Sequence, residues 1–470
     1  MVDRASRWDG GDRGAVVYSF NEAELLRGKR LRQERAEVLE VLKAALEAVD
    51  PGKLIKRHVR LEGDRLIIGE RAYDLKDYKN IFVIGGGKAS AALAQALEKI
   101  LGERISAGIV NTKYGYTAET EIIKINEAGH PLPDERGLRG VEEMRRLLSA
   151  ATEDDLIICL LSGGGSALMP LPAPGIGLEE KAQVTDLLLR SGAAIEELNT
   201  VRKHLSAVKG GQLARLAYPA EVIALILSDV LGDPLETIAS GPTVPDPTTF
   251  AEAQNILERY GLWERIPVAV REHILQGMAG EAPETPKPGD PCFAHVYNLI
   301  IGNNRLAVQA ALEKAEELGF NTMLLSTFLE GEAREVGKVL AALAKEVVHS
   351  GNPIPKKALI VAGGETTVTV RGQGRGGRNQ ELALSAAISI AGLDGVAIAA
   401  LATDGTDGPT DGAGGLVDGY TLKRARGKGL NPIEYLGNND SYNLLRRTGD
   451  LIITGPTNTN VNDLMLVAIF

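Results

Sequence analysis

The residues of this chain best suited to binding an anion stand in a glycine-rich turn between a predicted strand and a predicted helix. Residues 359–384 read LIVAGGETTVTVRGQGRGGRNQELAL, so an apolar run is followed by clustered glycines and then by Arg378. Leu382, Leu384 and Ala387 resume the apolar pattern at helical spacing, which places Arg378 near a helix start. Because helix N-termini carry free N–H groups and a partial positive charge, a guanidinium fixed there would strengthen an anion clamp. Taken alone, the segment is explained equally well by a solvated turn before an ordinary capped helix.

The same order of strand, glycine turn and helix occurs twice earlier in the chain. Residues 81–97 read IFVIGGGKASAALAQAL, with Lys88 directly after three glycines, and residues 155–168 read DLIICLLSGGGSAL. Two further apolar runs end in polar loops, at 222–234 and 396–415. Ligands of open α/β sheets bind beyond the carboxyl ends of the strands, so we expect one cleft to collect all five loops.

The elements that must position these loops indicate two α/β domains. Strands alternate with helices from residue 80 onward, which predicts an N-terminal, Rossmann-like and mainly parallel sheet. At 470 residues the chain is too long for a single hydrophobic core, so two domains are expected. The proline-rich stretch 281–291 is the best linker candidate. We therefore expect a flexible or loosely docked extension over 1–30, an N-terminal domain over 31–288 and a C-terminal domain over 289–470.

Local patterns give more detailed expectations at both ends of the chain. Residues 31–49 carry apolar side chains three and four positions apart and are expected to form a helix. Residues 59–75 are expected to form a small hairpin around Gly63 and Asp64. The last two apolar runs, 450–455 and 463–470, are expected to return to a sheet edge.

Composition limits the partners that the chain can have. Its 52 Lys and Arg residues against 62 Asp and Glu give a net charge of −10, which argues against a nucleic-acid surface. Only Cys159 and Cys292 are present, which suggests a reducing compartment. The N-terminus lacks an apolar signal region and no run is long enough to span a bilayer. We expect a cytoplasmic protein without nucleic-acid or membrane partners.

Eight motifs in a fixed order carry a resemblance to a known family. They read GGGKAS, LLSGGGSALM, LNTVRKHLSAVKGGQLA, ILSDVLGDPLETIASGPTVPD, GGETTVTV, GGRNQELAL, TDGTDGPTDGAGG and TGPTNTNVNDL. From residue 31 to residue 470, this pattern strongly resembles the glycerate kinases that carry a C-terminal MOFRL domain. The resemblance implies phosphorylation of D-glycerate to 2-phosphoglycerate with ATP as co-substrate and Mg²⁺ or another divalent cation. It also implies an active site in a cleft between two α/β domains.

Two cations are the main catalytic candidates. By resemblance, Lys88 and Arg378 match the two proposed catalytic cations of the family, which would hold the transferring phosphoryl group and the glycerate carboxylate. The spacing around Lys88 is not that of a Walker A motif. A lysine at a helix start is unfavourable unless an anion is present, which favours a binding role. We expect Lys88 and Arg378 to face one another across the cleft, with Asp404 or Asp229 nearby.

Carboxylates in the strand-end loops supply the remaining catalytic candidates. Asp404 and Asp407 share one glycine-rich loop, an arrangement that suits a hard cation such as Mg²⁺. An ordinary Asp-Gly turn is the alternative, and it is favoured for Asp411. Asp229 is the candidate general base toward the glycerate hydroxyl. Glu365 is a candidate for contact with the metal or the ribose.

Further candidates bind phosphate or substrate. The turn 162–166 offers a nest of N–H groups for an anion, although a simple tight turn explains it nearly as well. In segment 199–211, positions 202, 205, 206 and 209 would share one helical face. We expect Arg202 to point into the cleft, and His204 to pack rather than catalyse. The full set of predicted substrate- or phosphate-binding residues is Ser162, Gly163, Gly164, Gly165, Ser166, Arg202, Asn303 and Glu365.

Two other functions remain open from the residues alone. An NAD(P)H-dependent hydroxypyruvate reductase would need a Rossmann fingerprint, but Ser90 replaces its third glycine and no ribose-binding carboxylate follows the next strand. A non-catalytic phosphosugar-binding protein would need no aspartate loop at 404–411. Asn460, Asn462 and Asp463 are expected to close the site from the last strand. The expected partners are the small molecules D-glycerate and ATP, and a homodimer stays open.

Overall fold

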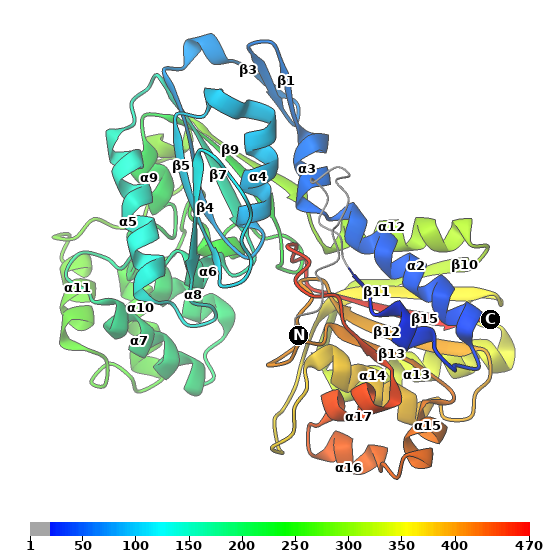
Figure 1. Cartoon of the computed structure of the whole chain (residues 1–470). Helices are drawn as coiled ribbons and strands as arrows, with labels where there is room; N and C mark the ends of the chain where they lie inside the picture. The colour runs from blue at the N-terminus through cyan, green and yellow to red at the C-terminus, as the bar shows by residue number, and fades with distance from the viewer. Residues whose placement is uncertain (1–18) are drawn as a thin grey trace, which may run out of the picture.

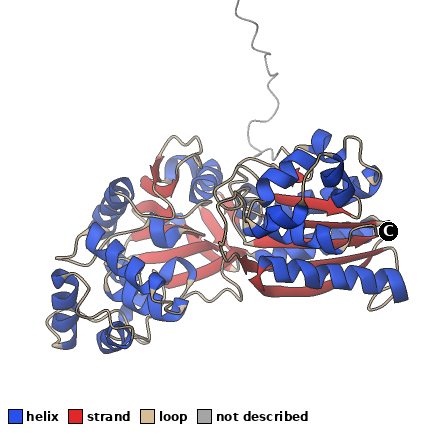
Figure 2. Cartoon of the chain, turned by 90° about the horizontal axis from the view of Figure 1, so that it is seen from below, coloured by secondary structure: helices blue, strands red, loops and turns tan. Residues whose placement is uncertain are grey.

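The computed structural model describes residues 19–470, which fold into two α/β units lying side by side (Figure 1). Each unit is built on a six-stranded sheet. Figure 2 shows helices on both faces of these sheets. The expected fold class, two α/β domains, is confirmed. No helix within residues 19–470 is long and apolar enough to cross a bilayer.

The sheet of the N-terminal unit is parallel throughout and has the order β6-β5-β4-β7-β8-β9. All eight residues of its strand β7 are buried, including Cys159, because helices cover both faces. The strands are β4 Asn80–Gly86, β5 Ala107–Lys113, β6 Ile123–Ala128, β7 Asp155–Ser162, β8 Glu221–Leu227 and β9 Val296–Gly302.

Helices surround this sheet and form a small lobe beside it. Helices α7, α8, α10 and α11 pack around an apolar core of their own that includes Val184, Leu198 and Phe250. The helices of this unit are α4 Ser90–Leu101, α5 Glu135–Ala150, α6 Gly165–Leu168, α7 Leu178–Arg190, α8 Ile195–His204, α9 Gln212–Ala217, α10 Phe250–Arg259 and α11 Val268–Met278. The expected hairpin at 59–75 is present and has a third strand. The three are β1 Val59–Glu62, β2 Arg65–Ile68 and β3 Arg71–Asp74.

The sheet of the C-terminal unit is mixed and has the order β10-β11-β15-β12-β13-β14. Strand β15 lies antiparallel between β11 and β12, in the middle of the sheet. The expectation that both last strands lie at a sheet edge is therefore wrong for β15 and right only for β14. The strands are β10 Asn321–Glu332, β11 Ala358–Thr367, β12 Val396–Ala402, β13 Gly414–Asp418, β14 Leu451–Ile452 and β15 Asp463–Ile469.

The helices of the C-terminal unit cover both faces of its sheet. Helix α14 begins at Arg378, as the apolar spacing after the glycine-rich turn predicts. The helices are α12 Asn304–Glu317, α13 Ala333–Ser350, α14 Arg378–Ser389, α15 Thr421–Gly427, α16 Pro432–Gly437 and α17 Ser441–Thr448.

The chain crosses between the two units in a way that the expected domain limits, 31–288 and 289–470, did not anticipate. Strand β9 follows the proline-rich stretch but pairs with β8 in the N-terminal unit. Helix α2, Arg32–Ala48, is present as predicted but packs against α12 of the C-terminal unit (Figure 1). The physical reason is that the unit to which β9 and α2 belong is set by the strand and the helix against which they pack. The proline content of a linker does not indicate those partners. The next helix, α3 Pro51–His58, then leads back to the N-terminal unit.

Part of the expected N-terminal extension is docked on the C-terminal unit. Residues 1–18 lie outside the described part of the chain. Helix α1, Glu22–Leu26, buries Leu25 completely. Lys29 is also buried, and its Nζ lies 2.8 Å from Asp450 Oδ1. The prediction of a flexible or loosely docked segment is therefore wrong for residues 19–30.

A buried guanidinium fastens α2 to the C-terminal sheet. Arg35 has no exposed surface, and its Nη1 lies 2.7 Å from Asp418 Oδ2 and its Nη2 3.1 Å from Asp450 Oδ1. Its remaining donors reach the carbonyl oxygens of Leu25 and Leu416. Each nitrogen of the guanidinium thus has at least one acceptor, as a buried charge requires.

Replacing this arginine tests how strongly α2 holds the unit together. We expect Arg35→Met to lower the free energy of unfolding by about 3–5 kcal/mol, because it leaves two buried carboxylates short of a cation. The measurement is chemical denaturation. The matched control is Arg30→Met, whose ion pair with Asp394 is 66% and 62% exposed and should matter little. Equal stability of the two variants would show that the buried network does not anchor α2.

Candidate active site

A cleft of about 840 Å³ lies between the two units. It is lined by residues that follow five strands, β4, β7, β8, β11 and β12, and these include Lys88, Gly164, Asp229, Arg378 and Asp404. The expectation that one cleft collects all five loops is confirmed. Each unit supplies part of the lining, so neither forms the site alone.

Lys88 and Asp404 form an ion pair across the cleft. Nζ of Lys88 lies 2.6 Å from Asp404 Oδ2, and the two side chains are only 15% and 8% exposed. Burial acts to lower the pKa of Lys88, but attraction by Asp404 and their hydrogen bond outweigh it and raise that pKa. Burial likewise acts to raise the pKa of Asp404, and Lys88 holds it below its usual value. Both groups are therefore charged at neutral pH.

The backbone around Lys88 is fixed by the neighbouring turn. The Lys88 N–H donates to the carbonyl oxygen of Gly163 at 2.8 Å. The next N–H, that of Ala89, donates to Ser162 Oγ at 3.0 Å. Helix α4 starts immediately afterwards, at Ser90. Ser162 thus serves the start of α4, and the glycine turn after β7 positions the lysine.

Arg378 is the first residue of α14 and is held by two carboxylates. Its Nε and Nη2 lie 2.6 and 3.1 Å from the two oxygens of Asp463, and its Nη1 lies 2.6 Å from Glu365 Oε1. Burial acts to lower the pKa of Arg378, but Asp463 and Glu365 raise it. Asp463 is fully buried whereas Glu365 is 45% exposed. An incoming anion can therefore replace Glu365 while Asp463 keeps the guanidinium oriented.

Asp229 sits where the two units meet on the cleft wall. Its Oδ2 accepts a hydrogen bond from Nδ2 of Asn460 at 3.0 Å. Burial, with repulsion from Glu365 and Asp404, raises the pKa of Asp229 to about 6, although Lys88 opposes the shift. A Cβ at Gly163 would lie only 2.1 Å from both the Asp229 Oδ2 and the Asn460 Nδ2. Only glycine at position 163 leaves room for this contact.

The two predicted metal ligands have different surroundings. Asp404 faces the cleft, and its Oδ1 accepts from the N–H of Thr406 at 2.9 Å. Asp407 also lines the cleft but is buried at the start of α14, where its oxygens accept from the N–H groups of Asn379 at 3.2 Å and Gln380 at 2.8 Å. Burial and repulsion by Asp463 raise the pKa of Asp407 to about 7. The geometry thus makes Asp407 a helix cap.

Comparison with known proteins places this architecture in a family. Residues 37–275 match a domain of unknown function, DUF4147, and residues 358–463 match the MOFRL family. A glycerate 2-kinase from Pyrococcus horikoshii is 45% identical over 432 residues, which cover 92% of this chain and 96% of that protein. The chain belongs to the glycerate kinases that carry a MOFRL domain.

Two further relatives show the fold of the family and the enzyme names that its members carry. The crystal structure of a glycerate kinase from Thermotoga maritima superposes with a TM-score of 0.81 at 44% identity, covering 93% of this chain and 99% of that chain. A protein from Agrobacterium vitis named putative hydroxypyruvate reductase is 44% identical over 389 residues, which cover 82% of this chain and 86% of that protein. The family and fold are therefore shared by proteins that bear two different enzyme names.

Several predicted binding residues of this glycerate kinase family member do not line the cleft. Arg202 lies on α8, which ends at His204, so the helical face predicted to run on to Lys209 does not exist. Asn303 caps α12 and donates to Asp233 Oδ2 at 2.6 Å. Of the turn 162–166, Gly164 lines the cleft. Gly165 packs toward Ala239, and Ser166 Oγ lies 2.7 Å from Ser240 Oγ.

His130 and Lys113 line the cleft but were not among the site candidates of the sequence analysis. His130 follows β6 and faces Gly164, and burial together with the charges of Lys88 and Lys113 lowers its pKa to about 4. It is therefore neutral at physiological pH. Lys113 ends β5 and also lines the cleft. Both stand at the carboxyl ends of parallel strands, so the rule that found the other loops could have found them. Strand β6 was not recognised because its six residues, IKINEA, are short and alternate apolar with polar side chains.

The close approach at Gly163 can be tested directly. We expect Gly163→Ala to cost about 1–3 kcal/mol of stability, because the new methyl group forces the Asp229 and Asn460 side chains apart. The control is Gly427→Ala, which has no atom within 4 Å of the added Cβ. Thermal unfolding of both variants measures the difference. A Gly163→Ala protein as stable as the control would contradict the described packing of the cleft wall.

Proposed function

We propose that this protein transfers the terminal phosphoryl group of ATP to the 2-hydroxyl of D-glycerate and releases 2-phospho-D-glycerate. The observation that carries the proposal is the cleft in which Lys88, Arg378 and Asp229 converge from three strand-end loops. The similar protein from Pyrococcus horikoshii is named glycerate 2-kinase, which supports the same activity here. Phosphoryl transfer requires charge neutralisation and alignment, and a cleft lined with paired cations supplies both.

In this proposal the two cations bind the two anionic groups. Arg378 keeps its two hydrogen bonds to Asp463 and exchanges the partly exposed Glu365 for a substrate anion. The planar guanidinium is well suited to bind the planar carboxylate of glycerate. Lys88 has three donors, so it can keep Asp404 and still reach the transferring phosphoryl group. The raised pKa of Lys88 keeps this ammonium protonated at neutral pH. Negative charge that shifts between phosphate oxygens during transfer would then meet a fixed positive charge.

Asp229 is the proposed general base. Burial raises its pKa to about 6, so the carboxylate is mostly ionised at neutral pH yet more basic than an exposed aspartate. The hydrogen bond from Asn460 fixes one of its oxygens. The glycerate hydroxyl would give its proton to this carboxylate as its oxygen attacks the phosphoryl group.

A divalent cation would enter with the nucleotide rather than occupy a protein cage. No three acidic, histidine or cysteine side chains within residues 19–470 are grouped to hold a metal by themselves. Mg²⁺ commonly needs only one or two protein carboxylates beside phosphates and water. Asp404 and Asp407 both line the cleft, and Asp404 fits that need better because Lys88, itself a cleft residue, holds one of its oxygens, whereas both oxygens of Asp407 cap α14. When bound, the cation would neutralise charge on the phosphates.

The reductase named for one relative has less support in this chain. A dinucleotide ribose normally meets a carboxylate at the end of the second strand. That strand is β5 here, and it ends in Asn111, Thr112 and Lys113. Asn111 is buried and donates to the carbonyl oxygens of Gly137 and Leu168, so it is fully used in packing. A cytoplasmic location, expected from the two cysteines, stays a prediction.

A coupled assay tests the reaction itself. We expect the purified protein to consume ATP with D-glycerate and Mg²⁺ and to oxidise no NADH with hydroxypyruvate. Lys88→Ala and Arg378→Ala should each lower kcat by about 100-fold or more, because each removes a fixed charge from the transition state. The control is Lys99→Ala, which removes an exposed lysine of α4. NADH oxidation without phosphoryl transfer would refute the kinase, and a near-normal kcat in either variant would refute that residue's role.

The pH profile tests the role of Asp229. Below a pH of about 6 the carboxylate binds a proton and can no longer accept one, so kcat/KM should fall as the pH drops through about 6. Asp229→Asn should lower kcat by about 100-fold or more at every pH. Asp186→Asn, at an exposed position of α7, serves as the control. A profile that stays flat down to pH values near the ordinary aspartate pKa would assign the base elsewhere.

A further inference from the structure

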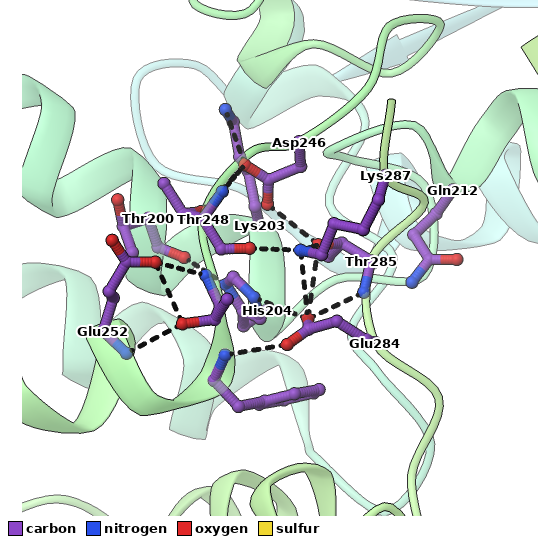
Figure 3. A network of polar contacts seen from close by, with 12 residues as sticks. Thr200, Lys203, His204, Gln212, Asp246, Thr248, Glu252, Glu284, Thr285 and Lys287 are labelled. Carbon is purple, nitrogen blue, oxygen red and sulfur yellow. Dashed lines mark hydrogen bonds and ion pairs between the residues drawn. The ribbon is translucent and has the colours of Figure 1, made fainter. Parts of the chain in front are cut away.

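Two buried bases on α8 have carboxylate partners. Figure 3 shows Lys203 beside Asp246, and His204 beside Glu284. Nζ of Lys203 lies 3.4 Å from Asp246 Oδ1, and Nε2 of His204 lies 2.9 Å from Glu284 Oε1. Loops beside the lobe formed by α7, α8, α10 and α11 thus place acidic residues next to these two buried bases.

Three other bases in the same region have none. Lys209 is 1% exposed, and its Nζ has no hydrogen-bond partner among residues 19–470. Lys181 on α7 is 6% exposed, and its Nζ reaches only the carbonyl oxygen of Leu171, at 3.4 Å. Arg202 on α8 is half-buried and makes no hydrogen bond or ion pair with any residue of the described chain. These three residues form a cluster that we call the unpaired cation cluster.

The three side chains lie close enough to act on one another. Burial, and then the charges of Lys181 and Arg202, lower the pKa of Lys209 far below its ordinary value. Burial and the charge of Arg202 lower the pKa of Lys181 in the same way. Ser206 connects the two lysines, since its Oγ donates to the Leu171 carbonyl oxygen at 3.1 Å and accepts from the Lys209 N–H at 3.3 Å. Like charges collected without a counterion destabilise the protein unless an anion joins them.

The backbone around the cluster is held in an unusual conformation. Ala239 and Ser240 have φ values of 50° and 63°, which non-glycine residues seldom adopt. The N–H groups of Gly210 and Gly211 donate to the carbonyl oxygens of Ser240 and Gly241 at 2.9 and 2.7 Å, which ties the turn after Lys209 to this strained segment. Strain that the surrounding structure maintains in this way is frequent at ligand sites.

The cluster adjoins the glycine turn that reaches the cleft. Ser240 Oγ lies 2.7 Å from Ser166 Oγ and 3.5 Å from Asn199 Oδ1. Asn199 precedes Arg202 by one turn of α8. Ser166 belongs to the same turn as Gly164, which lines the cleft. These contacts connect the cluster to the turn that reaches the cleft, and Arg202 is the most exposed of its three residues.

We propose that Lys181, Arg202 and Lys209 form a polyphosphate site that binds the triphosphate chain of the nucleotide co-substrate. The inference rests on the proposed function, because that function supplies a nucleotide. A glycerate carboxylate would neutralise one charge, whereas the terminal phosphate of a triphosphate alone carries about −1.5 to −2 at neutral pH. Three cations without carboxylate partners match a chain of several phosphates. The site assigns nucleotide binding to the N-terminal unit and leaves Arg378 of the C-terminal unit for glycerate.

Neutralising Lys209 separates this binding role from a structural one. Lys209→Met removes a buried amine that has no hydrogen-bond partner but keeps an unbranched apolar chain, so the ligand-free variant should melt at the wild-type temperature or above it. The same variant should raise the dissociation constant of a non-hydrolysable ATP analogue about tenfold or more, measured by calorimetry without glycerate. Arg202→Met should weaken binding similarly, and it decides the matter if Lys209→Met does not fold. Arg190→Met, which removes an exposed charge from α7, is the control and should bind as the wild type does.

The choice of probes keeps the two proposals separable. Inorganic tripolyphosphate should stabilise the wild type thermally and should lose this effect in Lys209→Met, whether or not the protein phosphorylates glycerate. Unchanged binding of the analogue and of tripolyphosphate in the folded variants would overturn the site. Dependence on these residues seen only with inorganic phosphate or 2-phosphoglycerate would overturn the assignment to the nucleotide. Absence of glycerate phosphorylation in the wild type would overturn the proposed function alone, since tripolyphosphate binding still tests the cluster.

Discussion

The buried ion pair between Lys88 and Asp404 is the contact on which the geometry of the site depends. One partner follows a parallel strand of the N-terminal unit and the other follows a strand of the mixed C-terminal sheet, so the pair joins the two units across the cleft. Neither charge could stay buried without the other. The hydrogen bond from Asn460 to Asp229 joins the units a second time on the same wall. The cleft is thus a product of the interface, and its charges are held where an anionic substrate must compete for them.

Positive charge is handled in two different ways in this protein. In the cleft, Lys88 and Arg378 already have carboxylate partners, and in the proposed function Arg378 exchanges Glu365 for the substrate while Lys88 keeps Asp404. Beside the helical lobe, the unpaired cation cluster has no carboxylate partner among residues 19–470. A bound anion would therefore supply the negative charge that the cluster lacks. Far from both places, Arg35 is neutralised on all sides and serves only to hold α2. The same residue types therefore serve binding or structure according to whether their partners are exposed, absent or buried.

The strand-end loops could be located from the sequence because each local signal was strong. Apolar runs followed by glycines fix the ends of β4 and β7, and Arg378 starts α14 where the helical spacing resumes. The failures have a common cause. Strand β9 and helix α2 were assigned to the wrong unit, β15 was placed at an edge, and Lys209 was placed on a helix that ends five residues earlier, at His204. In each case the decisive contact is made with a segment distant in sequence, and local pattern carries no information about that partner.

The sequence by itself determined which residues stand at strand ends and which backbone turns need glycine, because strand periodicity and left-handed turns are local properties. It also determined the family, since eight motifs in fixed order cannot arise from composition. Only the tertiary structure decided that Asp407 caps a helix while Asp404 meets Lys88, and that Asp463 orients Arg378. It alone revealed that three basic residues beside one another lack carboxylate partners among residues 19–470. The physical reason is that a side chain's charge, burial and pKa depend on atoms brought to it by folding, and those atoms come from residues hundreds of positions away.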